Sequence, residues 1–315
     1  SATHDIAADG FYMLGLTERQ QAFFVGIRNT AYRIAMLTGQ GAVVMLAGWL
    51  EERYGMRLPE EEAVPAAWSA TFYVLAGVFA LLFAYHQWTL PHPESDRPCR
   101  EGGNPLAAFG RTFASFFRKR GIVPALALIL LFRFAESQLV KIASPFLLDG
   151  REAGGLGLST IQVGTIYGAI GLAALTAGGI IGGIVMARHG LRRCVWGMTA
   201  AMNVPNLVYL YLAFAQPESE WIVSACVAIE QFGYGFGFTA LTYFMMLFCK
   251  GPQQTAHYAI CTGFMALGMM LPGMISGYIQ ELLGYRNFFI WIMVCTIPSF
   301  VAVKYARFPE KNSAE

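Results

Sequence analysis

Long apolar segments with few charges recur along this chain and constrain its fold more than any other feature. Eight of them have the length that a helix needs to cross a bilayer, about 20 residues. They cover residues 20–50, 67–89, 121–148, 159–187, 193–215, 220–249, 255–283 and 286–305. Only 13% of the 315 residues are charged, whereas soluble domains carry about 25%. The sequence therefore predicts an all-α, polytopic membrane helix bundle.

The connections between these segments predict the orientation of the helices. Fourteen of the 22 lysines and arginines lie in one alternate set of connections, which includes the long stretch 91–120, and four lie in the opposite set. Because cytoplasmic loops carry the excess of positive charge, we expect the 91–120 connection and the C-terminus to be cytoplasmic. Phenylalanines at helical spacing over 104–120 predict an amphipathic helix at the membrane surface, with a solvated linker as the alternative.

A glycine-rich, basic motif spans residues 182–193, where one segment ends and the next begins. Its glycines would allow close helix approach and a tight turn, and its arginines would hold the connection inside. The residues concerned are Gly183, Arg188, Gly190, Arg192 and Arg193. The motif resembles the loop signature G-x-x-x-D-R-x-G-R-R of the major-facilitator transporters, with Ala187 where the signature has Asp. An ordinary positively charged turn is the alternative.

The first residues, Ser-Ala-Thr-His-Asp-Ile-Ala-Ala-Asp, place Asp5 and Asp9 four apart on one helix face. This run resembles the fourth helix of the AmpG-like muropeptide permeases, a branch of the major facilitators that includes acetyl-CoA transporters. Tyr32-Arg33 and the run 250–289 are also similar to that branch. The resemblance covers nearly the whole chain, and it implies a proton-driven importer of anhydro-muropeptides, used in cell-wall recycling at the bacterial inner membrane.

Major facilitators have two six-helix halves joined by a long cytoplasmic loop. Residues 1–13 resemble the last half of a helix, so the chain fits this layout if roughly the first three and a half helices are missing. We therefore predict a remnant of the N-terminal bundle over 1–90, the central loop with its amphipathic segment over 91–120, and a C-terminal six-helix bundle over 121–315. Such a chain is expected not to transport by itself.

Ionisable residues within the apolar segments are the candidate functional residues, since a charge at bilayer depth costs at least about 2.5–3.5 kcal/mol without a cavity or partner. The candidates for proton coupling are Asp5, Asp9, Glu136 and Glu230. The candidates for substrate binding are Arg28, Arg33, Arg133, Lys141 and Gln231. Arg133 and Glu136 are expected to pair along one helix, with Lys141 two turns further on the same side. Structural ion pairs between helices are the alternative for each of them.

Several functional classes stay open at this point. A carrier of another solute, such as a sugar or an acyl-CoA, is one, and a non-transporting sensor or degenerate fragment is another. The five histidines have no metal-ligand spacing, so we expect no metal, no cofactor and no enzymatic activity. The expected partners are a small-molecule solute, protons and membrane lipid, without nucleic acid, and the full-length protein is expected to be a monomer.

Overall fold

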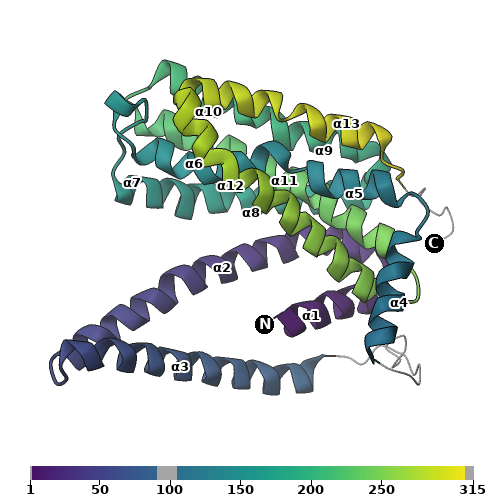
Figure 1. Cartoon of the computed structure of the whole chain (residues 1–315), viewed down its shortest axis with the longest axis horizontal. Coiled ribbons are helices and arrows are strands. Elements are labelled where there is room, and N and C mark those ends of the chain that lie inside the picture. The colour runs from purple at the N-terminus through teal and green to yellow at the C-terminus, as the bar shows by residue number, and fades with distance from the viewer. Residues whose placement is uncertain (1, 91–104, 309–315) are drawn as a thin grey trace. The chain divides into compact units, whose positions relative to one another are not determined.

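The computed structural model describes residues 2–90 and 105–308, and over these residues the chain forms helices joined by short turns, without a strand (Figure 1). By length and composition, six helical runs in the described part can cross a membrane. The predicted all-α membrane bundle is therefore confirmed. The chain divides into two compact units, one of residues 1–30 with 99–315 and the other of residues 31–98.

The smaller unit contains most of α2 (Glu18–Gly55) and α3 (Glu60–Thr89). The α3 helix starts directly after Pro59, whose fixed φ suits the residue before a first helical turn. Its large apolar side chains are exposed, including Phe72, Tyr73 and Trp88. A helix that is apolar around its circumference is typical of a membrane span. The predicted 20–50 segment is helical within α2, although α2 is not among the six spans.

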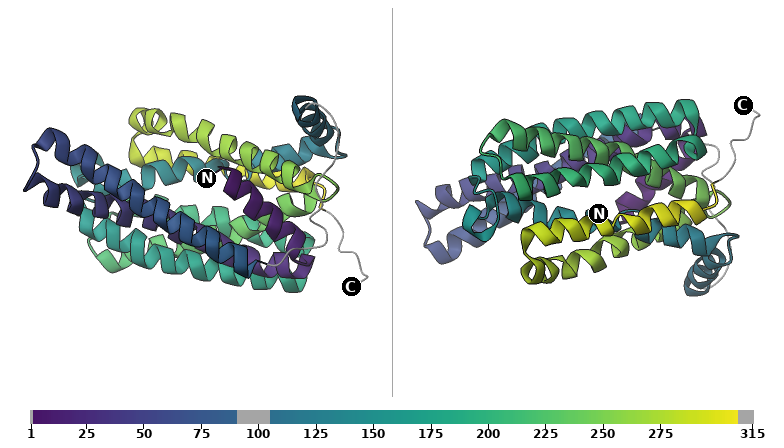
Figure 2. Two further views of the ribbon diagram at one scale, coloured as in Figure 1. Left: turned by 90° about the horizontal axis from the view of Figure 1, so that it is seen from below. Right: turned by 90° about the horizontal axis from the view of Figure 1, so that it is seen from above.

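The larger unit begins with α1 (Ala2–Gly15) and the first residues of α2, and it resumes with α4 (Pro105–Phe117). Its remaining α-helices are α5 (Ile122–Leu131), α6 (Phe134–Leu148), α7 (Thr160–Thr165), α8 (Leu172–His189), α9 (Leu191–Asn203), α10 (Leu207–Ala215), α11 (Glu220–Cys249), α12 (Gln254–Val294) and α13 (Ile297–Tyr305). Three short elements are η1 (Arg151–Ala153), the π-helix η2 (Ile166–Gly171) and η3 (Val204–Asn206). From α5 to α13 the helices run lengthwise beside one another, whereas α4 lies across one end of this group (Figures 1 and 2).

Several predicted spans are interrupted near their middle, which the hydropathy pattern does not indicate. The 121–148 segment is present as one span, Ile122–Leu148, but it is interrupted at Phe132–Arg133 between α5 and α6. The π-helix η2 interrupts 159–187, η3 interrupts 193–215, and the last span breaks between α12 and α13. The predicted division near residue 285 is present, because α12 turns at Gly284, which has φ 70°.

Two apolar cores fill the larger unit. The helix interruptions described above lie at the boundary between these two cores. One core includes Phe132 and Tyr234, and the other includes Ala135 and Val227 on the same two spans. Buried polar side chains lie at or beside these boundaries, and we call them the polar layer. Its members are Arg133, Glu136, Asn203, Asn206, Glu230, Gln231, Thr296 and Ser299. The bundle is thus apolar toward both ends and polar in between.

Close backbone contact joins α8 to α11. A Cβ atom built on Gly235 would lie 2.2 Å from the carbonyl oxygen of Leu175, well inside van der Waals contact. On the facing helix, a Cβ on Gly178 would lie 2.1 Å from the carbonyl oxygen of Phe232. Small residues at such crossings let two membrane helices approach at backbone distance. The two spans therefore pack as one rigid pair.

The α4 helix forms within the segment predicted to be amphipathic; residues 91–104 lie outside the described part. Phe116 is fully buried and stacks on Phe264 of α12, whereas Phe109 and Phe113 are exposed. The turn after α4 is held by Lys119, whose ammonium donates to the carbonyl oxygens of Phe248 and Lys250 at 2.9 and 3.1 Å. Burial lowers the pKa of Lys119 from its usual value. The α4–α5 turn therefore caps the end of α11.

Candidate functional site

Arg133 lies at the break between α5 and α6, in the middle of the larger unit. Its side chain is 6% exposed, and its Nη2 donates to the hydroxyl of Tyr234 at 2.6 Å. The guanidinium also lies over the rings of Tyr234 and Phe238, 5.1 and 4.7 Å from their centroids. Aromatic faces stabilise a cation without neutralising it. The bundle therefore holds an arginine against two stacked aromatic rings of α11 at the level of the polar layer.

The break itself is supported by a residue from the last span. Ser299 is fully buried, and its hydroxyl lies 3.0 Å from the carbonyl oxygens of both Leu131 and Phe132. A helix end away from water needs partners for its free carbonyl groups. The hydroxyl of Ser299 supplies one, so the interruption that positions Arg133 is built into the packing of α13 against α5.

The polar layer also brings together the two acids predicted from different spans. Glu136 and Glu230 are each 3% exposed, and Gln231 donates to Glu230 at 2.9 Å. The hydroxyl of Tyr167 in η2 contacts that of Tyr209 in α10, and both tyrosines lie within electrostatic range of both carboxyl groups. Two acids and two hydroxyl groups from four spans therefore form one buried cluster.

Some polar atoms in the layer have no partner among the described residues. They are Nε of Arg133 and both amide atoms of Asn206, which is 1% exposed. A buried polar atom without a hydrogen-bond partner costs about 1–3 kcal/mol. In native proteins such an atom usually binds a water molecule, an ion or a ligand. The unpaired donors and acceptors give the layer capacity to bind a polar solute.

A second cluster joins the start of the chain to α12. Asp9 of α1 forms an ion pair with Arg28 of α2, and Arg28 donates to the hydroxyl of Tyr258 at 3.2 Å. The guanidinium also lies over the rings of Tyr12 and Tyr258. A predicted proton-coupling acid and a predicted substrate-binding arginine are thus partners of each other. Asp9 is buried, whereas Arg28 is about half-buried.

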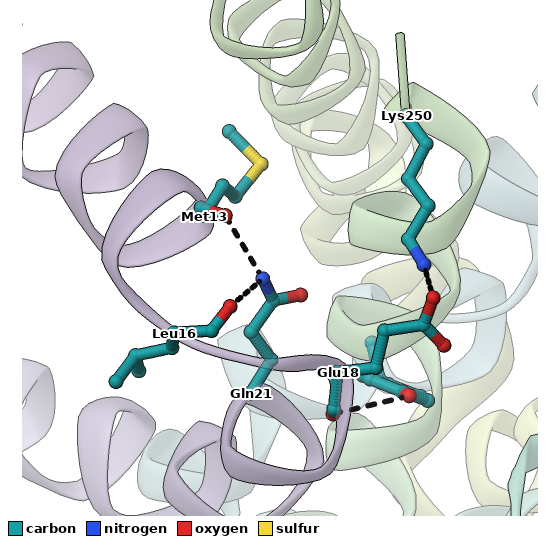
Figure 3. Close-up of polar contacts among 6 residues, drawn as sticks. Met13, Leu16, Glu18, Gln21 and Lys250 are labelled. Carbon is teal, nitrogen blue, oxygen red and sulfur yellow. Dashed lines mark hydrogen bonds and ion pairs between the residues drawn. The ribbon is translucent and has the colours of Figure 1, made fainter. Parts of the chain in front are cut away.

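A further ion pair and a helix cap lie beside this cluster (Figure 3). Glu18 at the start of α2 pairs with Lys250, which follows α11. Gln21 donates to the carbonyl oxygens of Met13 and Leu16, at 3.0 and 2.9 Å, and so caps the end of α1. The α1–α2 corner is therefore tied to the α11–α12 corner by the Glu18–Lys250 ion pair and by the hydrogen bond from Arg28 to Tyr258.

Other predicted residues lie away from these clusters. Lys141 is exposed on α6 and does not share the buried environment of Arg133. The side chains of Asp5 and Arg33 lie outside the described residues. In the basic motif, a Cβ on Gly183 would lie 2.4 Å from the carbonyl oxygen of Phe23, and Gly190 makes the α8–α9 turn with φ 76°. Its arginines, Arg188, Arg192 and Arg193, are exposed.

Sequence reasoning missed the tyrosines that surround the charged residues. Tyr209, Tyr234 and Tyr258 are buried and bond to another polar side chain. The signal that could have found them is a tyrosine inside an apolar span, because a buried hydroxyl needs a partner. Gln162, in contrast, is a polar residue of an apolar segment that forms a capping box with Ser159 at the start of α7.

Residues 12–246 match the family model of the Major Facilitator Superfamily. The match covers most of the chain and agrees with the helical architecture described above. The chain belongs to the Major Facilitator Superfamily. It is therefore a multi-pass membrane protein of a transporter family, whose members carry small-molecule solutes, and the relatives with a named function include a permease and a putative transporter.

Curated relatives indicate which branch of the superfamily this chain resembles. The chain is 24% identical over 312 residues to a putative transporter AmpG 4 of Rickettsia felis, covering 97% of this chain and 69% of the relative. It is 23% identical over 316 residues to the anhydromuropeptide permease of Escherichia coli K12, covering 98% and 58%. An uncharacterized protein of Haemophilus influenzae is 24% identical, covering 96% and 68%. The predicted likeness to the AmpG-like branch is confirmed.

Proposed function

We propose that this protein is part of a proton-coupled importer of anhydro-muropeptides in the bacterial inner membrane, with its C-terminus in the cytoplasm. The polar layer carries the proposal, because it places two acids, an arginine and unpaired amide groups between two apolar cores. The substrate class follows from the similarity to a relative named as an anhydromuropeptide permease. Because the chain spans 58% of that relative, the transport activity is proposed for the whole carrier.

The chemistry of the polar layer suits a solute with both acidic and amide groups. Arg133 can donate to a carboxylate of the solute from the nitrogen that lacks a partner. Asn206 can donate and accept, as a peptide or sugar requires. Glu136 and Glu230 supply carboxyl groups that can take up and release protons within one cycle. The tyrosine pair between the spans gives these protons a hydroxyl path.

The Asp9–Arg28 pair provides a way to couple a proton to movement. While Asp9 is ionised, it holds Arg28 against Tyr258 and thereby ties α1 and α2 to α12. Protonation of Asp9 removes the charge that Arg28 pairs with, which weakens this link. In the proposed cycle, the link opens when Asp9 is protonated and forms again when the proton leaves to the cytoplasm.

The first test is uptake of a labelled anhydro-muropeptide by cells that lack their own permease and express the gene in its full reading frame. Glu136→Gln and Glu230→Gln are expected to lower proton-driven accumulation at least tenfold. Exchange of labelled for unlabelled solute should persist, because it moves no net proton. Glu152→Gln, an exposed acid in η1, serves as the control and should accumulate solute like the parent.

The outcomes separate coupling from substrate identity. Accumulation by both glutamine variants at the parent rate would show that these acids carry no proton. Uptake of a simple sugar or an acyl-CoA in place of the muropeptide would assign a different solute to the same carrier. Absence of any uptake by the parent in the presence of a proton gradient would contradict the transport proposal itself.

A further inference from the structure

A groove lies between the start of α2 and the end of α8, on the side of the larger unit where the basic motif lies. It has a volume of about 450 Å³ and is lined by residues of 17–24 and 184–188. Both segments belong to the same compact unit. The groove is separate from the polar layer and from the Asp9–Arg28 cluster, and neither the family match nor the relatives assign it a role.

The charge in this groove is entirely positive. Arg19 and Arg188 line it, both side chains are exposed, and the lining among the described residues contains no acid. Ala187 also lines the groove, at the position where the loop signature has Asp. Arg19 and Arg188 thus line one groove, and no acidic residue of the described part is in its lining. Arginine pairs of this kind bind phosphate groups through parallel N–H donors.

The rest of the groove is apolar and aromatic. Phe23 and Phe24 follow Arg19 by about one helical turn, and their rings meet edge to face with centroids 5.0 Å apart. Each remains 39% exposed, so the groove offers apolar contact area directly beside the guanidinium groups. An amphiphile could place an anionic head group at the arginines and a hydrocarbon chain along the phenylalanines. A free inorganic anion would contact only the arginines.

We propose that this groove binds an anionic phospholipid, with the phosphate between Arg19 and Arg188 and an acyl chain along Phe23 and Phe24. Basic pockets between membrane helices are known sites for anionic lipid head groups. A lipid seated here would contact α2 and α8 beside their close approach, where a Cβ on Gly183 would lie 2.4 Å from the carbonyl oxygen of Phe23, a residue of the groove lining. It would therefore fill the opening beside a close helix crossing.

Native mass spectrometry of the purified chain in detergent tests this proposal. Phosphatidylglycerol, phosphatidylcholine with the same acyl chains, and glycerol 3-phosphate are titrated separately. Phosphatidylglycerol is expected to bind most tightly. Arg19→Gln and Arg188→Gln should each lower the affinity for phosphatidylglycerol about fivefold, since a basic residue near an anionic lipid contributes roughly that factor to binding. Arg57→Gln, an exposed arginine outside the groove, should bind phosphatidylglycerol like the parent.

Ala187→Asp provides a second test that keeps both arginines. Its carboxylate should compete with the lipid phosphate for the two arginines. The affinity for phosphatidylglycerol should therefore fall by a similar factor, while the affinity for phosphatidylcholine stays unchanged. Circular dichroism confirms that each variant is folded. Parent-like affinity for phosphatidylglycerol in the Arg19→Gln/Arg188→Gln double variant would overturn the proposal. So would glycerol 3-phosphate binding as tightly as the whole lipid, because the aromatic wall would then contribute nothing.

Discussion

At the scale of single residues, the charged groups in the spans are held by tyrosines rather than by opposite charges alone. Arg133 bonds to Tyr234, Arg28 bonds to Tyr258, and Tyr167 with Tyr209 lies beside the two acids. Hydropathy finds the charged members because they stand out in an apolar segment. It does not find their partners, since a tyrosine is counted with the apolar residues and its hydroxyl contact depends on another span.

Replacement of Tyr234 by Phe tests how Arg133 is held. The substitution removes the hydroxyl that accepts from Nη2 and keeps the ring that the guanidinium covers. A buried charged donor without its acceptor costs about 1–3 kcal/mol, so we expect thermal unfolding in detergent at a lower temperature. Tyr211→Phe, at an exposed tyrosine of α10, is the control. Equal unfolding midpoints for both variants would show that Tyr234 does not support Arg133.

At the scale of helices, apolar length predicted where the spans lie but not where they are interrupted. The break at Phe132–Arg133 has no local signal, because its support comes from Ser299 more than 160 residues later. Pro205 marks η3, but Pro145 and Pro272 lie inside α6 and α12 without ending them, so a proline in a span does not by itself predict an interruption. The position of these spans along the chain could thus be predicted from sequence, whereas the meeting of several interruptions in one layer required the tertiary structure.

Replacement of Gly235 by Ala tests the contact between α8 and α11. The new methyl group would meet a backbone oxygen at 2.2 Å, so the two helices must move apart. Overpacking of this kind costs about 1–3 kcal/mol, and the variant should unfold at a lower temperature or at lower denaturant. Gly197→Ala in α9 meets no atom within 4 Å and should be as stable as the parent or slightly more stable. Equal loss in both variants would assign the effect to glycine replacement in general.

At the scale of the whole molecule, the larger unit combines the chain's first helices with its last ones. The ion pair of Glu18 with Lys250 and the hydrogen bond from Arg28 to Tyr258 both contribute to this arrangement, and Asn29 adds a contact to Thr242 at 3.5 Å. The division into an N-terminal remnant, a central loop and a C-terminal bundle remains a prediction. In a carrier that alternates between two openings, this set of contacts must form in one state and separate in the other.

An exchange of charges between Glu18 and Lys250 tests whether this ion pair holds α2 against α11 in one state of the carrier. Thr242 is 3% exposed, so a cysteine placed there reports separation of α2 from α11 through its alkylation rate. Glu18→Lys and Lys250→Glu should each raise this rate, by up to about fivefold, because an exposed ion pair contributes about 0.2–1 kcal/mol. The double exchange should return the rate toward that of the parent. Additive increases in the double variant would show that the pair does not hold this state.

The π-helix η2 has a consequence for how this sequence tolerates insertions and deletions. A π-helical turn contains one residue more than the α-helical turn it replaces, and each residue of an α-helix turns the chain by about 100°. Deletion of a single residue within 166–171 would therefore be absorbed as an ordinary helix, with Tyr167 or its neighbours turned away from Tyr209. The α11 helix has no π-helical turn with an additional residue. The same deletion there would rotate every following side chain of that span. Codon deletions should thus be survivable at η2 and lethal to folding in α11.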